Sequence, residues 1–259
     1  MDSHRHAVTS ADGTEIGLLT AGDGPPLLLV HGGMGCIESW QPLWDPLTSR
    51  WQVTAMDRRG RGSSGDAQPY DLSQEFEDVT AVAASLGQPD MFGHSYGAVA
   101  ALGAVAQGAP VRRLALYEPP GPQTVPSQWR ERMLPMITAG QPGRAMFSFL
   151  TEIIGLSAEE VAALRDAPRD YDVMPIVSAT MPRESEALGL VDLAGLAARV
   201  EIPVLLLLGS ASPAWAQEII HDLDDALAHA TLAVLDGQGH DAISQAPLLL
   251  VDQIAGFFS

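Results

Sequence analysis

Short apolar segments, each bounded by Gly, Pro or Asp, constrain the fold of this chain more than any other feature. They do not alternate polar with apolar residues, which is typical of strands that are buried on both faces. Between them, apolar residues spaced three and four apart predict helices. This alternation predicts an α/β fold with a mostly parallel sheet and helices on both faces. The strands are expected at 27–30, 53–56, 91–92, 114–117, 204–208 and 232–235, and the helices at 72–86, 98–107, 214–228 and 248–258.

The N-terminal segment 1–9 is polar and holds His4 and His6, so we expect a frayed start without an export signal. The longest apolar runs, 25–30 and 202–208, are much shorter than the roughly 20 residues that a membrane helix needs. The single cysteine, Cys36, has no partner for an intramolecular disulfide. These features predict a cytoplasmic protein that does not associate with membranes.

The charge balance excludes several function classes. The chain has 32 acidic against 14 basic residues and a net charge of −18, which repels the phosphates of nucleic acids and of anionic lipids. It contains no lysine, which excludes Schiff-base chemistry and the lysine of a P-loop. We therefore expect a small-molecule substrate and no nucleic-acid partner, and a homodimer is compatible with this composition. The Ala-rich, Lys-free composition also indicates a GC-rich bacterial genome.

The segment Gly93-His94-Ser95-Tyr96-Gly97 stands between a predicted strand and a predicted helix. It fits the G-x-S-x-G turn, which holds a serine in a strained backbone conformation and exposes its hydroxyl. Glycine is needed two residues before and after the serine, because a Cβ there would collide with the neighbouring strand and helix. The pattern predicts Ser95 as a nucleophile and the Tyr96 backbone NH as a donor to an oxyanion.

A glycine-rich loop, His31-Gly32-Gly33-Met34-Gly35, follows the strand predicted at 27–30. Its backbone NH groups can complete an oxyanion hole beside the serine. We predict Gly33 NH as the second donor, with Met34 NH as the alternative, and the Met34 side chain as part of a pocket for the acyl group. His31, which ends the strand, is expected to pack and hydrogen-bond the loop.

The only GxGxxG pattern spans Gly60 to Gly65 and resembles a dinucleotide-binding fingerprint. Pro69 and Tyr70 follow where the phosphate-binding helix should already run, and Asp57 and the cluster Arg58-Arg59-Arg61 precede or interrupt the glycines. We expect no nucleotide cofactor here.

His240 follows the last predicted strand, on a glycine-rich loop that precedes a closing helix. It comes after Ser95 in the chain, as the base of a serine nucleophile does in the G-x-S-x-G context. We predict His240 as the general base. The other histidines lack such a position, and no metal site is expected.

The order of these motifs along the chain carries a family resemblance. Together they resemble the α/β-hydrolase superfamily over nearly the whole chain. The resemblance implies an eight-stranded sheet, a serine nucleophile and a helical cap after the sixth strand, here residues 119–198, between core segments 1–118 and 199–259. The motifs are HGGMG at 31–35, DRRGRGSSG at 57–65, GHSYG at 93–97 and GQGH at 237–240.

The acid of the catalytic triad is where the chain departs from this family. In most relatives the acid follows the seventh strand, three residues after a glycine, and Ser212 occupies that position here. Glu118 ends the preceding strand, at the alternative acid position of some haloalkane dehalogenases of the superfamily. We predict a Ser95–Glu118–His240 triad, with a structural strand cap as the alternative role of Glu118. Ser212 is expected to contribute little.

These residues predict acyl transfer without a cofactor. His240 would take the proton of Ser95, Ser95 would attack a carbonyl, and water would resolve the acyl-enzyme. Methionines of the inserted segment suggest an adaptable apolar pocket, so we expect a small to medium hydrophobic ester, lactone or thioester. The predicted pocket residues are Met34, Met136 and Met146.

Two different functions stay compatible with the sequence. One is an enzyme with the same pocket and a reaction other than ester hydrolysis, as in cofactor-free haloperoxidases or perhydrolases, C–C bond hydrolases, lyases and cyclases. The other is a non-enzymatic ligand receptor on the same scaffold. Multiple turnovers would distinguish an enzyme from a receptor.

Overall fold

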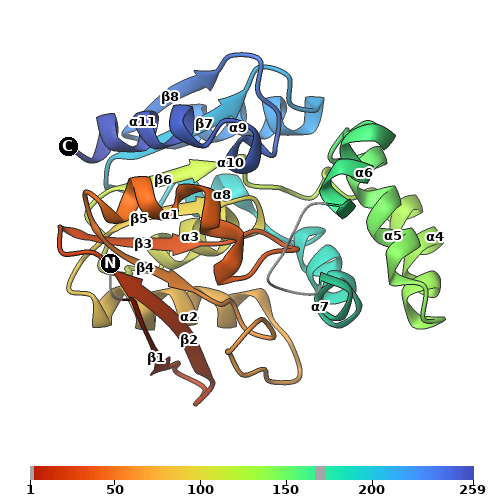
Figure 1. The fold of residues 1–259 in the computed structure, drawn as a ribbon, viewed down its shortest axis with the longest axis horizontal. Helices are drawn as coiled ribbons and strands as arrows, with labels where there is room; N and C mark the ends of the chain where they lie inside the picture. The colour runs from red at the N-terminus through yellow and green to blue at the C-terminus, as the bar shows by residue number, and fades with distance from the viewer. Residues whose placement is uncertain (1–2, 167–172) are drawn as a thin grey trace.

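A computed structural model describes residues 3–166 and 173–259, and an eight-stranded sheet forms its centre (Figure 1). The strand order is β1-β2-β4-β3-β5-β6-β7-β8. β1 and β2 run antiparallel to their neighbours, and the strands from β3 to β8 are parallel. The predicted α/β class and mostly parallel sheet are confirmed. The strands are β1 Ser3–Thr9, β2 Glu15–Ala21, β3 Pro26–Val30, β4 Gln52–Met56, β5 Asp90–His94, β6 Leu114–Tyr117, β7 Val204–Gly209 and β8 Ala230–Leu235.

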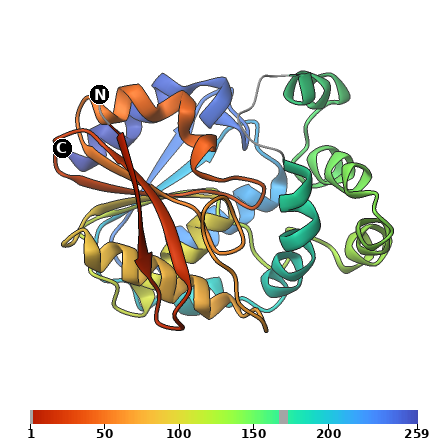
Figure 2. The ribbon, with the colours of Figure 1, turned by 60° about the horizontal axis from the view of Figure 1, so that its bottom comes forward.

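Helices cover both faces of the sheet, so each central strand is apolar on both sides. In β3, Leu27 and Leu29 point into one hydrophobic cluster, while Leu28 and Val30 point into the other. Figure 2 shows α1 and α11 on one side of the sheet and α2 on the other. This arrangement explains why the strand sequences do not alternate. The helices of the two faces are α1 Gln41–Thr48, α10 Ala242–Gln245 and α11 Pro247–Phe258 on one, and α2 Leu72–Ser85, α3 Tyr96–Ala106, α8 Leu193–Ala197 and α9 Ala214–Ala226 on the other.

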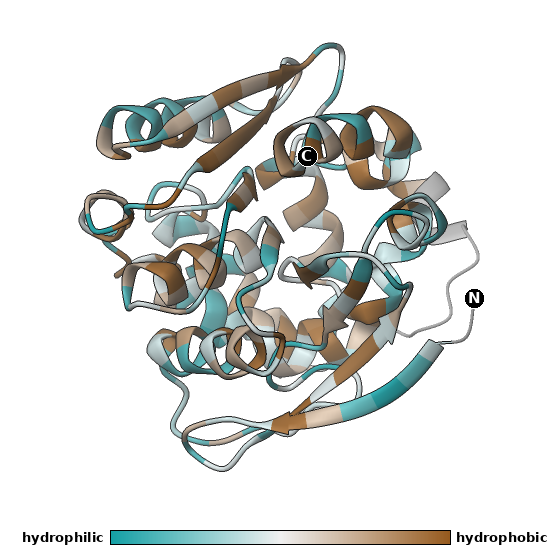
Figure 3. Cartoon of the chain, turned by 90° about the vertical axis from the view of Figure 1, so that its left-hand side faces the viewer, coloured by the Kyte–Doolittle hydropathy of each residue, from teal (hydrophilic) through white to brown (hydrophobic). Residues whose placement is uncertain are grey.

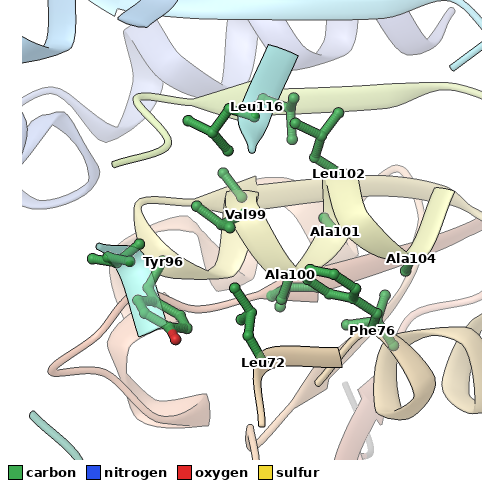
Figure 4. Close-up of a cluster of buried hydrophobic side chains, with 14 of the residues drawn as sticks. Leu72, Phe76, Tyr96, Val99, Ala100, Ala101, Leu102, Ala104 and Leu116 are labelled. Atoms are coloured by element: carbon green, nitrogen blue, oxygen red, sulfur yellow. The ribbon is translucent and has the colours of Figure 1, made fainter. Parts of the chain in front are cut away.

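Helix α3 is the most deeply buried helix of the core and starts directly at Ser95. Figure 4 shows it between Leu116 of β6 and the side chains of Leu72 and Phe76 from α2. A Cβ on Gly103 would lie 2.2 Å from the ring of Phe76, so glycine is what allows α2 and α3 to pack this closely. The close packing fixes the position of the α3 N-terminus relative to the sheet.

Between β6 and β7 the chain forms a run of helices, which Figures 1 and 2 show gathered beyond one end of the sheet, except for α8. α8 packs against α3 and α9 of the core. The division into a core and a cap of residues 119–198 stays a prediction. The helices of this segment before α8 are α4 Ser127–Thr138, α5 Pro142–Ser148, the π-helix η2 Phe149–Ile153, α6 Ala158–Asp166 and α7 Val173–Leu188.

The N-terminus differs from its prediction. Residues 3–9 form β1, which pairs with β2 from Ser3 opposite Ala21 to Thr9 opposite Glu15, so the expectation of a frayed start is wrong for these residues. The side chains of β1 are almost all exposed, and Figure 3 shows this strand as mostly hydrophilic. Backbone hydrogen bonds to β2 hold β1 in place. Such bonds leave no hydrophobic pattern in the sequence. No helix in the described part of the chain is long and apolar enough to cross a membrane.

The fold depends on glycine at position 97. A Cβ on Gly97 would lie 2.2 Å from the carbonyl oxygen of Val30 and 2.4 Å from that of His31. We predict that Gly97→Ala lowers the free energy of unfolding by about 2 kcal/mol or more, because backbone atoms cannot move aside as a flexible side chain can. Chemical denaturation measures this change.

Gly256 in α11 provides the matched control. A Cβ there meets nothing within 4 Å, so Gly256→Ala should stabilise the protein by about 0.5–1 kcal/mol through helix propensity. Equal effects of the two substitutions would contradict the packing described for Gly97.

Candidate active site

Ser95 lies between β5 and α3 in a backbone conformation that L-residues rarely adopt. Its φ is 53° and its ψ is −125°, and its NH donates to the carbonyl of Tyr117 on β6 at 2.8 Å. Such strain costs on the order of 1–3 kcal/mol and persists only where the surroundings impose it. Here the close approaches at Gly93 and Gly97 impose it, since a Cβ at either would overlap backbone atoms.

A cavity of about 610 Å³ opens in front of Ser95 and is mostly apolar. Its size falls within the range of about 300–1,000 Å³ that is usual for small-molecule sites. The loop from His31 to Gly35, Ser95 and His240 line it. The helical segment between β6 and β7 and helix α9 also contribute to its lining, with Met146, Phe149, Leu150, Ile154, Met181 and Trp215 among the residues.

The structure brings His240 and Glu118 together. His240 is buried on the loop after β8, and its Nδ1 lies 2.6 Å from Glu118 Oε2. Because the carboxylate accepts, Nδ1 carries the donated proton and a neutral ring keeps a lone pair on Nε2. The ring also packs against Trp215 and His94, with centroids 5.3 and 4.9 Å away. The contacts therefore fix both the tautomer and the plane of the imidazole.

Glu118 is fully buried and connects three strands of the sheet. It follows β6 with φ of 45°, a left-handed conformation that is uncommon outside glycine. Its Oε1 accepts hydrogen bonds from Gly209 N at 2.7 Å and from Ser212 Oγ at 2.5 Å, while its Oε2 contacts His240. Ser212, expected from the sequence to contribute little, thus donates one of the two hydrogen bonds to Oε1.

The loop after β3 is anchored through its carbonyl groups. The carbonyl of Gly32 accepts from His31 Nδ1 at 2.9 Å and from Arg58 Nη1 at 3.2 Å, and the carbonyl of Gly33 accepts from Arg61 Nη2 at 2.6 Å. A Cβ on Gly32 would stand 3.1 Å from Ser95 Cβ, so loop and serine are adjacent. The peptide NH groups of Gly33 and Met34 belong to these anchored peptides, which holds them in fixed directions.

His31 has the structural contacts that the sequence suggests. Its Nδ1 bonds the carbonyl of Gly32, and its Nε2 accepts the Arg58 backbone NH at 3.0 Å. Burial, together with the nearby charges of Arg58 and Arg61, lowers the pKa of His31 well below its ordinary value. Both ring nitrogens are occupied, so His31 has no free lone pair to act as a base.

The arginine cluster after β4 forms buried ion pairs, which the sequence did not specify. Arg58 makes two bonds to Glu75, at 2.6 and 2.7 Å, and one at 2.6 Å to Glu184 of α7. Burial alone would lower the pKa of Arg58, but Glu75 and Glu184 raise it well above its ordinary value. Arg61 also bonds Glu184, at 2.6 Å. All three side-chain nitrogens of Arg58 thus bond groups of the chain, whereas Arg61 does so through Nη2 alone.

Of the predicted pocket methionines, the structure brings Met34 and Met146 to the cavity but not Met136. Met136 lies on α4 and packs against the hydrophobic core cluster. It is one residue from the buried Ile137 and therefore about 100° around the helix from it. The methionines of this segment predicted an apolar surface, but their spacing did not show which of them line the cavity.

One group near the cavity has the donor atoms of a metal site. Cys36, Glu38 and Asp57 offer ligand atoms within 4.8 Å of one another. The carboxylate of Asp57 already accepts from the backbone NH groups of Ile37 and Ser63, and burial raises the pKa of the Cys36 thiol to about 12. Both oxygens of the Asp57 carboxylate are thus bonded within the chain.

The chain belongs to the alpha/beta hydrolase family, whose model matches residues 27–253. An α/β hydrolase of known structure from Sphaerobacter thermophilus is 34% identical, with a TM-score of 0.85 over 98% of this chain and 100% of that one.

Two curated relatives match shorter parts of the chain. N-formylmaleamate deformylase of Pseudomonas putida is 35% identical over 139 residues, which are 49% of this chain and 52% of the relative. The non-heme haloperoxidase of Rhodococcus erythropolis is 37% identical over 94 residues, 35% of this chain and 34% of the relative. The matches thus span about half and about a third of the two relatives' lengths.

His94 generates a prediction about acid stability. Its Nε2 donates to the carbonyl of His240 at 3.0 Å, and removal from water, followed by the proximity of His240, lowers the pKa of His94 to about 3. The unfolded chain takes up a proton near pH 6.5, whereas the folded chain does not. The contribution of His94 to the free energy of unfolding is therefore fully present above pH 6.5 and is lost as the pH falls toward 3. At pH 5 this loss amounts to about 2 kcal/mol.

We predict that His94→Gln has a smaller loss of unfolding free energy between pH 7 and pH 5 than the wild type. Denaturant titrations at both pH values measure the difference. His229→Gln, at an exposed position, is the control and should follow the wild type. An equal acid sensitivity in His94→Gln would contradict the assignment of a neutral His94.

Proposed function

We propose that this protein is a serine hydrolase that cleaves a small to medium hydrophobic ester, lactone or thioester through an acyl-enzyme. The observation that carries the proposal is the contact of 2.6 Å between His240 Nδ1 and the buried Glu118, at the edge of a cavity that Ser95 also lines. A serine on a strained turn, a histidine of fixed tautomer and a buried carboxylate are the parts that nucleophilic acyl transfer requires.

Each group has a distinct role in the proposed reaction. His240 Nε2 accepts the proton of Ser95 Oγ as this oxygen attacks the substrate carbonyl, and Glu118 stabilises the imidazolium that forms. The tetrahedral intermediate collapses when His240 returns the proton to the leaving oxygen or sulfur. Water, deprotonated by His240, then attacks the acyl-enzyme and releases the acid together with free Ser95. No cofactor takes part in these steps.

The backbone NH groups of Gly33 and Tyr96 are the proposed donors to the oxyanion. Tyr96 begins α3, so its NH has no partner within the helix and gains from the helix dipole. Gly33 NH belongs to the peptide whose carbonyl, on Gly32, is bonded by His31 and Arg58. Donors fixed in advance do not have to reorganise when the charge develops, which is the main advantage of such a site.

A second candidate reaction shares the acyl-enzyme and differs only in its last step. If hydrogen peroxide replaces water as the acceptor, the product is a peracid, as in cofactor-free haloperoxidases and perhydrolases. The similarity to a non-heme haloperoxidase over 94 residues favours this candidate over C–C bond cleavage, elimination or cyclisation. The ratio of peracid to acid formed at a known peroxide concentration distinguishes the two reactions.

The nucleophile can be tested directly. We predict that a fluorophosphonate probe labels the wild type and that Ser95→Ala is not labelled, because the strained turn presents an activated hydroxyl. Ser178→Ala, at an exposed position of α7, is the control and should be labelled like the wild type. Peptide mass spectrometry locates the adduct, and an adduct on any residue other than Ser95 would refute the proposal.

The role of the acid can be tested at two positions. We predict that Glu118→Gln lowers turnover by about a thousandfold or more, because a neutral amide cannot stabilise the imidazolium and favours the wrong tautomer. Ser212→Ala removes one hydrogen bond to the carboxylate and should lower turnover by about tenfold.

The double variant Glu118→Gln/Ser212→Asp provides a rescue. It returns a carboxylate to the position that most relatives use, so part of the lost turnover should come back. If Glu118→Gln is harmless while Ser212→Ala is crippling, the orienting group is on the loop after β7 and the assignment of Glu118 is wrong.

A further inference from the structure

Glu184 of α7 is a buried carboxylate that lines the same cavity as Ser95. Its Oε1 accepts from Arg58 Nη2 and from Arg61 Nη2, each at 2.6 Å. Its Oε2 has no hydrogen bond to any residue that the structure describes. A Cβ on Gly33 would stand 3.5 Å from Oε2, so this oxygen lies beside the proposed oxyanion loop.

Glu184 and Glu75 of the same cluster are bonded differently. Glu75 places both of its oxygens on Arg58, and one of them also accepts from the hydroxyl of Tyr70. Glu75 does not line the cavity, whereas Glu184 gives one oxygen to the arginines and leaves the other on the cavity wall. The ion pairs that Glu184 makes with Arg58 and Arg61 involve only its Oε1.

Glu184 lies in a buried cluster of two arginines and two glutamates. Arg58 and Arg61 carry two positive charges, and Glu75 and Glu184 carry two negative ones, so the cluster is neutral in sum. A carboxylate oxygen in a largely apolar cavity is costly unless a donor reaches it. The arginines fix the direction of the Glu184 carboxylate. Oε2 is therefore an oriented acceptor for a hydrogen-bond donor in the cavity.

We propose that Glu184 is a recognition site for a hydrogen-bond-donating substituent, an ammonium or a hydroxyl, on the acyl part of the substrate close to the scissile carbonyl. This inference rests on the proposed function and adds a substrate class to it. Oε2 accepts the N–H or O–H of the substituent while the substrate carbonyl lies on Gly33 NH. A substrate with a carboxylate at the same place is repelled by Glu184.

A matched series of esters tests the proposal. The series consists of p-nitrophenyl butyrate, its 3-hydroxy and 3-amino derivatives, and mono-p-nitrophenyl succinate. For the wild type we expect kcat/KM to be about tenfold higher for the hydroxy and amino esters than for butyrate, and lower for the succinate than for butyrate.

The variant Glu184→Gln should reverse the preference between the amino ester and the succinate. Its amide oxygen can stay on the arginines, and its NH₂ group then faces the cavity as a donor. The preference for the amino ester over the succinate should fall by about a hundredfold or more. Glu75→Gln, which makes the same charge change in the same cluster away from the cavity, should keep the wild-type preference within about threefold.

Two outcomes would overturn the proposal. An unchanged preference in Glu184→Gln means that Oε2 does not bind the substituent. Equal changes in Glu184→Gln and Glu75→Gln mean that the net charge of the cluster, rather than a contact, sets the preference. If Glu184→Gln does not fold, as judged by its thermal melt, Glu184→Asp withdraws the carboxylate by one methylene, and the same loss of preference is expected from it.

Binding separates this inference from the proposed function. Calorimetry with the same esters on Ser95→Ala measures the preference without turnover. If Ser95 does not turn the esters over, the proposed function fails, but tighter binding of the amino and hydroxy esters, lost in Ser95→Ala/Glu184→Gln, still supports the Glu184 site. Equal binding of all the esters overturns the site even if Ser95 catalyses their hydrolysis.

Discussion

The buried carboxylate of Glu118 holds the carboxyl ends of β6, β7 and the loop after β8 together. One oxygen contacts His240, and the other accepts from Gly209 and Ser212. A buried charge is stabilised only when hydrogen bonds replace its water, and here three donors do so. The same contacts orient the imidazole, so the structural and the proposed catalytic roles of Glu118 belong to one group.

The glycine-rich loop after β3 depends on a second set of buried charges. Arg58 and Arg61 bond the carbonyls of Gly32 and Gly33 and also the carboxylate of Glu184. The loop that supplies the proposed oxyanion donors is therefore linked to α7, which contributes to the lining of the cavity.

Much of the sheet and of the site could be predicted from local sequence. The central strands are apolar on both faces, and the glycines at 93 and 97 can be explained only by close backbone contacts around Ser95. The strands and these glycines are encoded within a few residues. The prediction for Glu118 depended instead on the resemblance to the α/β-hydrolase superfamily, which marks position 212, 94 residues further on, as the usual place of the acid.

Other features depend on contacts that leave no local pattern. β1 could not be predicted because its side chains are exposed and backbone pairing with β2 holds it. Helix α1 was not predicted, because Pro42 and Pro46 give this segment a low helix propensity. The acids that pair with the arginines after β4 could not be predicted, because Glu184 is 126 residues from Arg58 and only the fold brings them together.

In the proposed reaction, acyl transfer passes through Ser95 with support from Glu118. Rapid-quench mass spectrometry of the Glu118→Gln variant with p-nitrophenyl butyrate measures this step most directly. We predict a butyryl group on the peptide that contains Ser95, formed and lost more slowly than in the wild type. Product formation with no adduct on Ser95, or an adduct on another residue, would contradict it.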